Sequence, residues 1–404
     1  MNIAIIGGGA AGFFSAINAK ENYPKANVVI FEKSQKVLSK VKISGGGRCN
    51  VTNGCSSINE LIKAYPRGGK KLKKIFQEFN TTDTVKWFES RNVPLYTQED
   101  NRVFPKSNNS QSIIDCLFKE INRLSIYLEL GIRIEKIERV KESLKLYIKD
   151  KEPQKFHRVI VAVGGSPKKE GLSWLEKLGH KIESPVPSLF TFNIPNDTIT
   201  KLMGLVADPV LASIQGTKLK STGPLLITHW GMSGPAILKL SSIGARILNE
   251  KKYDFKVQVN WINQPNNEKI ANEIKQIIKL HPNKIINNIK PFKLPERLWS
   301  FIVEKSELPD NKKWGELGKK GINKIVTLLS NDIYHVKGKT TFKEEFVTCG
   351  GISLESIELK TMESKSCKGL YFAGEILDID AITGGYNFQA AWSSGYIAGK
   401  LNSI

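Results

Sequence analysis

The first 32 residues constrain the fold of this chain more than any other segment. In order, they read as a short apolar strand, a glycine turn, a helix and a second apolar strand, the alternation typical of a βαβ unit. Gly7, Gly9 and Gly12 occupy the three glycine positions of the pattern G-x-G-x-x-G. The first permits a sharp turn, the second lets a pyrophosphate approach the backbone, and the third allows the helix to pack closely on the strand. This segment therefore predicts a dinucleotide-binding unit.

The end of the second strand carries the acidic residue that such a unit needs. Glu32 follows Gly12 by twenty residues, the spacing at which a carboxylate accepts a hydrogen bond from a ribose 2′-hydroxyl. A 2′-phosphate would be repelled there, so the pattern disfavours NADP at this position. The N–H groups at the start of the helix and its positive dipole end favour phosphate binding. We therefore predict Ala10, Ala11 and Lys33 as cofactor-binding residues together with the glycines and Glu32.

The composition indicates a folded protein with a strong basic excess. Its 404 residues, 40% of them hydrophobic, suffice for two or three domains with sizeable cores. The net charge of +21 raises the question of a nucleic-acid partner. However, fifty lysines outnumber ten arginines and are scattered, whereas phosphate recognition favours arginine. We interpret the densest basic cluster as the solvated face of a helix: Arg67, Lys70, Lys71, Lys73 and Lys74.

The cysteines indicate neither a disulfide framework nor a metal site. There are five, no C-x-x-C pair occurs, and none is spaced with histidine as metal ligands are. Reduced thiols are the default for such a pattern, which favours a cytoplasmic location. The glycine turn interrupts the apolar N-terminus, so it is not a signal peptide, and no apolar run approaches the ~20 residues of a membrane helix. We expect no metal and no membrane partner.

The order of the apolar segments predicts an interrupted domain. Residues 158–163 and 369–373 are continuous apolar strands, typical of a buried parallel sheet. The residues between them change from short alternating strands to a helical pattern in which Trp299 and Trp314 are expected core residues. We predict an α/β fold with three parts: a discontinuous Rossmann-like FAD/NAD(P)-binding domain over 1–188 and 338–404, an inserted β-barrel-like subdomain over 189–264, and an inserted helical subdomain over 265–337.

Periodicity also predicts the elements within the discontinuous domain. Helices are expected over 58–92, 110–124 and 388–400, and strands over 126–130, 132–137 and 144–148. Residues 33–55, which contain the run Ser-Gly-Gly-Gly, are expected to form a loop. Residues 101–105 are expected to be either a turn or a place where Arg102 binds an anionic group of a substrate.

Three further glycine-rich segments are expected to meet the first one. Ligands of open parallel sheets bind beyond the carboxyl ends of the strands, where Gly164–Gly165 and Gly374–Glu375 should lie. Gly384–Gly385, at the start of the last helix, should close one side. NAD needs only the first segment, whereas a cofactor with a ribityl chain and a tricyclic ring would use all four. Glu375 would then accept hydrogen bonds from ribityl hydroxyls, and the last helix would direct its positive end at the flavin N1–O2 edge.

Five longer motifs follow one another along nearly the whole chain: Lys42–Asn53, Thr228–Leu238, Val347–Ser353, Gly369–Glu375 and Thr383–Gly395. They resemble those of the HI0933-like, or BaiN-type, family of bacterial flavoproteins, also labelled the aminoacetone oxidase family of FAD-binding enzymes. The resemblance implies non-covalently bound FAD, a two-dinucleotide-binding-type fold, and an inserted β-barrel with a helical part. The chain differs from the family pattern after Gly165, where a stretch is shorter, and at Trp230, where arginine is expected.

The glycine loop and the last helix supply the remaining candidate residues. We predict cofactor contacts from two runs: Ser44, Gly45, Gly46, Gly47, Arg48, Cys49 and Asn50, and Gly384, Gly385, Tyr386 and Asn387. Arg48 either places a cation near the pyrophosphate or flavin ring or forms a structural salt bridge. Asn50 either binds flavin or substrate or caps its loop. Cys49 has no obvious base or partner thiol, so we interpret it as a small buried residue. Arg48, Asn50 and Tyr386 are the candidate catalytic residues.

These observations predict an FAD-dependent oxidoreductase that acts on a small organic substrate. One complete glycine motif with a following acid is present and FAD requires it, so NADH or NADPH, if used, would enter transiently. Reduction of a conjugated carbonyl compound and oxidation of an amine by O₂ both fit. Two alternatives are a flavin-dependent RNA-modifying or RNA-binding protein, motivated by the charge, and a non-catalytic redox-sensing flavoprotein. The sequence does not define an oligomeric state.

Overall fold

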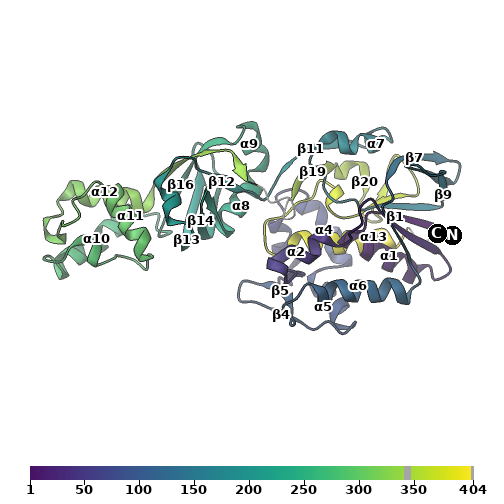
Figure 1. The fold of residues 1–404 in the computed structure, drawn as a ribbon, viewed down its shortest axis with the longest axis horizontal. Helices are drawn as coiled ribbons and strands as arrows, with labels where there is room; N and C mark the ends of the chain where they lie inside the picture. Colours follow the sequence, from purple (N-terminus) through teal and green to yellow (C-terminus); the bar gives the residue numbers. More distant parts are fainter. Residues whose placement is uncertain (341–346, 402–404) are drawn as a thin grey trace. The chain divides into compact units, whose positions relative to one another are not determined.

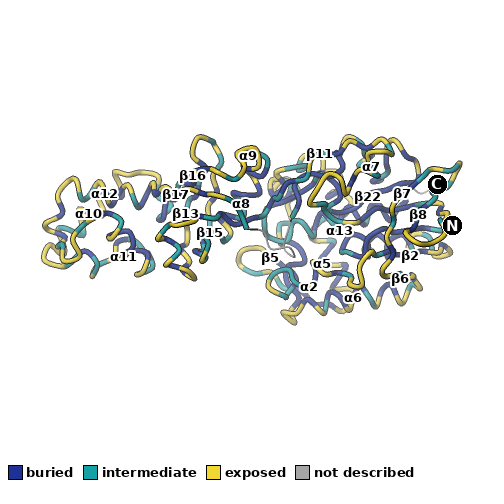
Figure 2. Tube along the Cα trace, turned by 45° about the horizontal axis from the view of Figure 1, so that its top comes forward, coloured by how far each residue is buried: buried dark blue, intermediate teal, exposed yellow. Residues whose placement is uncertain are grey.

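The computed structural model describes residues 1–340 and 347–401. The chain divides into two compact units, one made of Met1–Ser188 and Phe342–Ile404 and the other of Leu189–Thr341 (Figure 1). Each unit has its own cluster of buried hydrophobic side chains, which follows the buried segments in Figure 2. None of the described helices is long and apolar enough to cross a membrane.

The first unit is built on a seven-stranded sheet in the order β20-β21-β22-β10-β1-β2-β6. In that order, the strands span Ile357–Glu358, Glu363–Ser364, Leu370–Phe372, Arg158–Val161, Asn2–Ile6, Asn27–Glu32 and Tyr127–Leu130. The C-terminal strand β22 pairs in parallel with β10, which pairs in parallel with β1. Segments near both ends of the chain therefore contribute to one Rossmann-type sheet, which confirms the predicted discontinuous α/β fold.

The first βαβ unit forms where the sequence predicts it. Helix α1 (Ala10–Asn22) connects β1 to β2, and these strands pair in parallel from Asn2 with Asn27 to Ile6 with Phe31. The apolar side chains of β1 are fully or almost fully buried. A continuous apolar run suits this strand because both faces of a parallel sheet are covered.

The last helix packs closely along the first. Helix α13 (Tyr386–Gly399) approaches α1 at two glycines that leave no room for a side chain. A Cβ atom on Gly395 would lie 3.0 Å from the carbonyl oxygen of Ala11, and one on Gly399 would lie 2.7 Å from Cβ of Asn18. The two helices are thereby fixed side by side, with both N-termini near the glycine-rich loops.

The other elements of the first unit are shorter. Its remaining helices are α2 (Ser39–Gly47), α3 (Ile58–Leu61), α4 (Gly69–Glu78), α5 (Thr81–Glu89), α6 (Gln111–Arg123) and α7 (Ser173–Glu176). Its smaller sheets are β3-β5-β4 (Thr52–Asn53, Arg102–Pro105, Leu95–Thr97), β7-β8-β9 (Ile134–Val140, Ser143–Ile148, Gln154–Phe156) and β11-β19 (Ile182–Pro187, Thr348–Ile352).

Two local expectations were wrong. The segment expected as a loop contains α2, although Ser44–Gly46 leave the helical conformation within it. Residues 101–105, expected as a turn or as a place where Arg102 binds an anionic group, include strand β5, whose Val103 and Phe104 are buried. Arg102 forms an exposed ion pair with Asp100, at 2.6 Å. Tertiary burial decides the case of β5, because the two consecutive apolar residues Val103 and Phe104 carry no periodic signal.

The second unit contains a sheet in the order β17-β16-β13-β14-β15-β12-β18. In that order, the strands span Asp332–Lys337, Asp254–Asn260, Val206–Ile214, Lys220–Thr228, Gly231–Ser233, Thr191–Asn193 and Lys339–Thr340. β17 and β18, the two ends of this order, are separated along the chain by Gly338 alone, so the segment 332–340 pairs with β16 on one side and with β12 on the other. The β-rich part is therefore barrel-like, as predicted. It shares its hydrophobic core with the helical part.

The helical part of the second unit packs around two tryptophans. The helices are α8 (Pro235–Ile243), α9 (Ala245–Glu250), α10 (Asn267–Leu280), α11 (Glu296–Lys305) and α12 (Lys319–Ser330). The rings of Trp299 and Trp314 are fully buried and stack 6.0 Å apart, which confirms both as core residues. Asp332 at the start of β17 is also buried, and accepts hydrogen bonds from Trp261 Nε1 (3.0 Å) and Lys305 Nζ (2.6 Å).

Candidate functional site

The first glycine turn has a different physical constraint at each glycine. Gly7 has φ +116°, and a Cβ there would lie 2.3 Å from the carbonyl oxygen of Ala162. A Cβ on Gly12 would lie 1.9 Å from the carbonyl oxygen of Gly7. At Gly9, the residue before α1, a Cβ would meet nothing within 4 Å. The turn therefore packs tightly behind the first and third glycines and is open at the second, where a phosphate group would approach.

Glu32 is held against this turn. Its two carboxylate oxygens accept hydrogen bonds from the N–H groups of Gly8 (2.8 Å) and Ser34 (2.9 Å). A carboxylate has about four lone-pair sites, so these bonds leave capacity for ribose hydroxyls. Glu32 thus orients the turn from the end of β2, a second task that the spacing alone did not indicate. Lys33 is exposed beside it.

The second glycine loop ends α2 with three consecutive left-handed residues. Gly45, Gly46 and Gly47 have φ values of +59°, +70° and +84°. A Cβ on Gly45 would lie 2.8 Å from the Phe104 ring, whereas at Gly46 and Gly47 it would meet nothing within 4 Å. The Ser44 hydroxyl donates back to the carbonyl oxygen of Val41 (3.2 Å). The loop is therefore fixed on one side and open on the other.

Arg48 and Cys49 follow this loop in contrasting environments. The Arg48 guanidinium lies over the Phe104 ring, 4.1 Å from its centroid, and its Nε donates to the carbonyl oxygen of Gly45 (3.2 Å). It makes no ion pair in the part of the chain that the structure describes. Cys49 is fully buried, and burial raises the pKa of its thiol to about 12. The thiol is therefore neutral and is not a reactive nucleophile.

Asn50 ties the loop to the start of α13. In the amide orientation that satisfies both ends, its Oδ1 accepts from the N–H of Gly385 (2.9 Å) and its Nδ2 donates to the carbonyl oxygen of Thr52 (3.0 Å). Gly385 has φ +89°, and a Cβ there would lie 2.2 Å from the same carbonyl oxygen. Asn53 Nδ2 in turn donates to the carbonyl oxygen of Gly384 (3.0 Å). Gly384 and Gly385 therefore pack against the segment Asn50–Asn53 and do not present an open face there.

Tyr386 and Asn387, the first residues of α13, are half-buried and hydrogen-bond to neighbouring segments. Tyr386 is half-buried, and burial, followed by the nearby Cys55, raises the pKa of its hydroxyl. Its carbonyl oxygen accepts a hydrogen bond from the Tyr65 hydroxyl (2.7 Å). Asn387 closes its own loop, since its amide exchanges hydrogen bonds with the N–H (2.9 Å) and carbonyl oxygen (3.2 Å) of Ala381.

The strand ends bring together the third set of predicted residues. Gly164 has φ +77° and an open face, whereas a Cβ on Gly165 would lie 2.3 Å from Thr348 Oγ1. Glu375 accepts from the N–H of Thr348 (2.9 Å) and pairs with Lys40 Nζ (2.6 Å). The buried Thr348 hydroxyl has no hydrogen-bond partner within the described residues. An orphaned buried hydroxyl beside a carboxylate suits a polar ligand atom.

Together these loops fit an extended dinucleotide. Gly374, which follows β22, packs against the first turn of α1, where its Cβ would lie 2.7 Å from Cβ of Ala11. The segments Gly7–Gly12, Gly164–Gly165 and Gly374–Glu375 are thus linked through contacts with Ala162, Thr348 and Ala11. Open glycine faces and hydrogen-bonding groups are what a phosphate-containing cofactor requires. No cluster of metal-ligating side chains occurs among residues 1–340 and 347–401.

A buried ion pair beside this site was missed by the sequence reasoning. Arg67 donates through Nε to Oδ1 of the fully buried Asp380 (2.6 Å), and Ser188 hydrogen-bonds to the same carboxylate. Burial lowers the pKa of Arg67, but the hydrogen bond and charge of Asp380 outweigh this effect and raise it. The assignment of Arg67 to a solvated face was therefore wrong, whereas Lys70, whose side chain is exposed, belongs to such a face. No local sequence pattern distinguishes the buried Arg67 from the exposed Lys70.

The motif Thr228–Leu238 lies in the second unit. His229 is exposed, and its ring centroid lies 3.8 Å from that of Trp230. Neither belongs to the loops described above.

The chain belongs to the HI0933-like family, because the model of the HI0933-like protein Rossmann domain matches residues 1–401. It is 29% identical to a 3-dehydro-bile acid delta(4,6)-reductase of Clostridium scindens, over 98% of each chain. It is 27% identical to a ribosomal RNA dihydrouridine synthase of Haemophilus influenzae, over 97% of this chain and 96% of the other. The counterpart of that synthase in Escherichia coli is 26% identical, over 97% and 95%.

Solved structures share the fold at low sequence identity. One is a flavocytochrome c3 fumarate reductase in an open conformation, with a TM-score of 0.52 and 16% identity over 99% of this chain and 77% of the other. Another is a 3-ketosteroid-delta4-(5alpha)-dehydrogenase of Rhodococcus jostii, with a TM-score of 0.52 and 11% identity over 98% and 96%. At these identities the likeness concerns the fold.

Proposed function

We propose that this protein is an FAD-dependent oxidoreductase that reduces a carbon–carbon double bond conjugated to a carbonyl group. The observation that carries the proposal is the open glycine face at Gly9, Gly46 and Gly164, each on a loop otherwise fixed by packing or hydrogen bonds. Three separate loops with this property suit a long cofactor better than a single mononucleotide.

The chain offers a distinct group to each part of such a cofactor. Glu32 would accept hydrogen bonds from the adenosine ribose, and the N–H groups at the start of α1 would bind the pyrophosphate. Thr348 and Glu375 would meet the ribityl chain. When bound, FAD supplies hydride transfer, and the protein contributes orientation and electrostatics.

The relatives support reduction over amine oxidation. A 3-dehydro-delta(4,6) steroid and a uracil ring both contain a double bond conjugated to a carbonyl group, and the relatives' names describe reduction of such rings. This reaction needs a hydride at the carbon β to the carbonyl, a proton at the α carbon, and stabilisation of charge on the oxygen. The Tyr386 hydroxyl is protonated at neutral pH, as an ordinary tyrosine is, and it would donate the proton. The Arg48 cation would stabilise the oxygen.

Anaerobic spectroscopy of the purified protein tests this proposal. We expect a flavin spectrum, bleaching of that spectrum by NADH or NADPH, and its return when a conjugated enone is added. A saturated ketone of the same size is the matched control and should leave the reduced spectrum unchanged. A colourless protein that FAD cannot reconstitute contradicts the cofactor, whereas reoxidation by O₂ but by no enone contradicts the reaction.

RNA is the second candidate substrate, because two relatives are ribosomal RNA dihydrouridine synthases and this chain is strongly basic. Residues 189–341 hold 23 lysines and arginines against 12 aspartates and glutamates. Mass spectrometry of ribosomal RNA from cells with and without the gene would decide the matter. A uridine that gains two hydrogens only when the gene is present supports RNA, and identical RNA in both strains favours a small-molecule substrate.

A further inference from the structure

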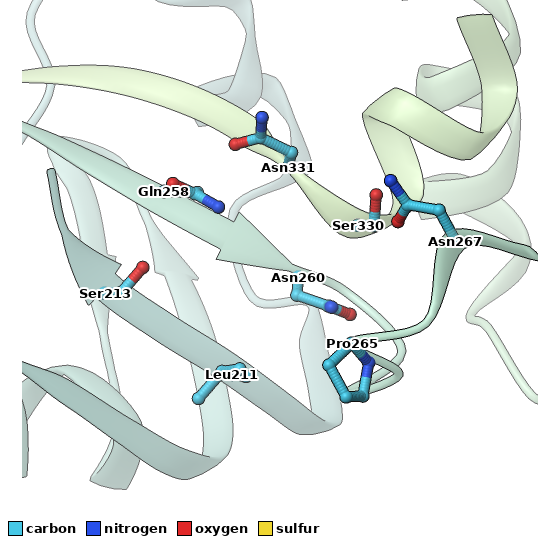
Figure 3. Close-up of a pocket in the computed structure, with 8 residues that line it drawn as sticks. All are labelled: Leu211, Ser213, Gln258, Asn260, Pro265, Asn267, Ser330 and Asn331. Carbon is cyan, nitrogen blue, oxygen red and sulfur yellow. The ribbon is translucent and has the colours of Figure 1, made fainter. Parts of the chain in front are cut away.

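The second unit contains a polar pocket that the proposed reaction does not use. It has a volume of about 270 Å³ and lies between the sheet and the start of α10 (Figure 3). Its lining residues are Leu211, Ser213, Gln258, Asn260, Pro265, Asn267, Ser330 and Asn331.

The lining carries no formal charge, although the unit around it is strongly basic. Six of the eight side chains are amides or hydroxyls, which both donate and accept hydrogen bonds. Such a lining discriminates against an isolated phosphate or a metal ion, each of which needs compensating charge. It suits a neutral group that presents donors and acceptors side by side.

Some of these polar side chains hydrogen-bond to the protein backbone, and others make no hydrogen bond to the described residues. Asn260 holds its own loop, because its Nδ2 donates to the carbonyl oxygen of Gln264 (2.8 Å). Ser330 donates to the carbonyl oxygen of Val326 (2.8 Å). By contrast, the half-buried side chains of Ser213 and Gln258 make no hydrogen bond to the described residues. These two groups are therefore available to a ligand.

The sheet register places positive charge beside these two residues. Ser213 on β13 is directly paired with Gln258 on β16 and, on its other side, with Lys220 on β14. Paired residues share a sheet face, as do residues two apart on one strand, so Lys256 lies on this face too. Both lysines are exposed. A neutral pocket is thus flanked on one face by two cations.

We infer that this pocket binds the base of a nucleotide, whose phosphate lies toward Lys220 or Lys256. A glutamine amide presents N–H and C=O groups in the geometry that pairs bidentately with a base edge. The base must be unpaired, since its hydrogen-bonding edge has to be free. The nucleotide could be free in solution or part of single-stranded RNA. This inference stands apart from the proposed reduction, because it rests on the second unit alone.

Binding of a fluorescent single-stranded RNA oligonucleotide to the full chain, measured over a range of salt concentrations, tests the inference. Gln258→Ala should weaken binding about tenfold at every salt concentration, because a bidentate base contact is uncharged. Lys256→Ala should instead reduce the slope of log affinity against log salt by about one. Gln276→Ala, which removes an exposed glutamine of α10 outside the pocket, is the matched control and should bind as the unchanged protein does.

Competition identifies the source of the nucleotide. Uridine monophosphate that displaces the RNA in a Gln258-dependent way supports a free-nucleotide site, and displacement only by unlabelled oligonucleotide supports RNA. Equal affinities for Gln258→Ala and Gln276→Ala overturn the inference, as does failure of both ligands to bind. Ser213→Ala provides a second, smaller change, and thermal unfolding of each variant verifies that it folds. None of these outcomes depends on flavin loading, so they leave the test of the reduction independent.

Discussion

In the first unit, α1 and α13 are each preceded by a glycine, and the two glycines lie in opposite environments. At α1, the flanking Gly9 faces open space, and the Gly9 side of the helix start has no side-chain cap from the described residues. At α13, the flanking Gly385 is pressed against the carbonyl oxygen of Thr52, and its N–H is accepted by Asn50. The same local signal therefore forms a phosphate-binding turn in one place and an internal clamp in the other. At α13 we propose that the Tyr386 side chain is the group that meets a ligand.

The largest expected effect tests that last statement. If Tyr386 donates the proton in the proposed reduction, Tyr386→Phe should lower the rate of enone-dependent reoxidation by about 10²- to 10⁴-fold, the usual contribution of a general acid. FAD retention should be unchanged, because the Tyr386 hydroxyl takes no part in the hydrogen bonds that Asn50 and Asn53 make to Gly385 and Gly384. Stopped-flow spectroscopy measures both quantities, and Tyr127→Phe, which alters a 66% exposed ring, is the control. An unchanged rate would remove Tyr386 from the reaction.

The loop that leads into α13 depends on a buried charge. Asp380→Ala leaves Arg67 buried without its carboxylate, so we expect the free energy of unfolding to fall by about 3–5 kcal/mol. Urea denaturation measures it. The control is Glu60→Ala, which breaks an ion pair with Lys63 that is more than half exposed and should cost less than about 1 kcal/mol. Similar losses in the two variants would mean that the buried pair contributes no more than a surface pair.

Replacement by alanine should have different effects at Gly385 and at Gly9. Gly385→Ala adds a methyl group 2.2 Å from a carbonyl oxygen at φ +89°, so it should destabilise the protein by about 1–3 kcal/mol. Gly9→Ala adds a methyl group in open space, so it should leave thermal unfolding of the cofactor-free protein unchanged and weaken FAD binding. Differential scanning fluorimetry and FAD titration separate these effects. Equal destabilisation by both substitutions would contradict the distinction between an open turn and a clamp.

A substitution of Glu32 tests the role of the Gly7–Gly12 turn in FAD binding. Glu32→Ala should weaken FAD retention by about 1–3 kcal/mol, the range for hydrogen bonds to a charged group. Part of any loss of stability will come from the N–H groups of Gly8 and Ser34, so the cofactor-free protein must be measured as well. Glu89→Ala, on the exposed end of α5, serves as the reference. If FAD affinity does not change, Glu32 only orients the turn.

The smallest expected effect is a pH dependence of stability, caused by a histidine outside the starts of α1 and α13. His180 is buried against Phe372 of β22, and burial lowers the pKa of its imidazole. The unfolded chain therefore binds a proton more readily, so stability is complete above about pH 6.5 and falls as the pH drops through that value. Thermal unfolding between pH 8 and pH 5 should show this decline, and His180→Gln should reduce it. Parallel pH profiles for the two proteins would assign the decline to other groups.

The accuracy of the sequence reasoning varied with how local each constraint was. The Rossmann-type sheet, the βαβ unit and the burial of Trp299 and Trp314 were predicted, because hydrophobic period and glycine spacing report directly on local structure. The buried pair of Arg67 and Asp380 was not predicted, since its partners are more than 300 residues apart along the chain. The strand at Arg102–Pro105 was missed because its burial depends on neighbouring strands.

The glycine turn with its acidic partner and the further glycine-rich segments of one α/β sheet can be read from the residues alone. Which glycines face open space and which are pressed against a carbonyl oxygen depends on the folded chain. The folded chain also determines that Thr348 presents an orphaned hydroxyl beside Glu375 and that Ser213 and Gln258 share a polar pocket. The physical reason is that a sequence pattern specifies backbone conformation over a few residues, whereas access to a ligand depends on atoms brought from distant segments.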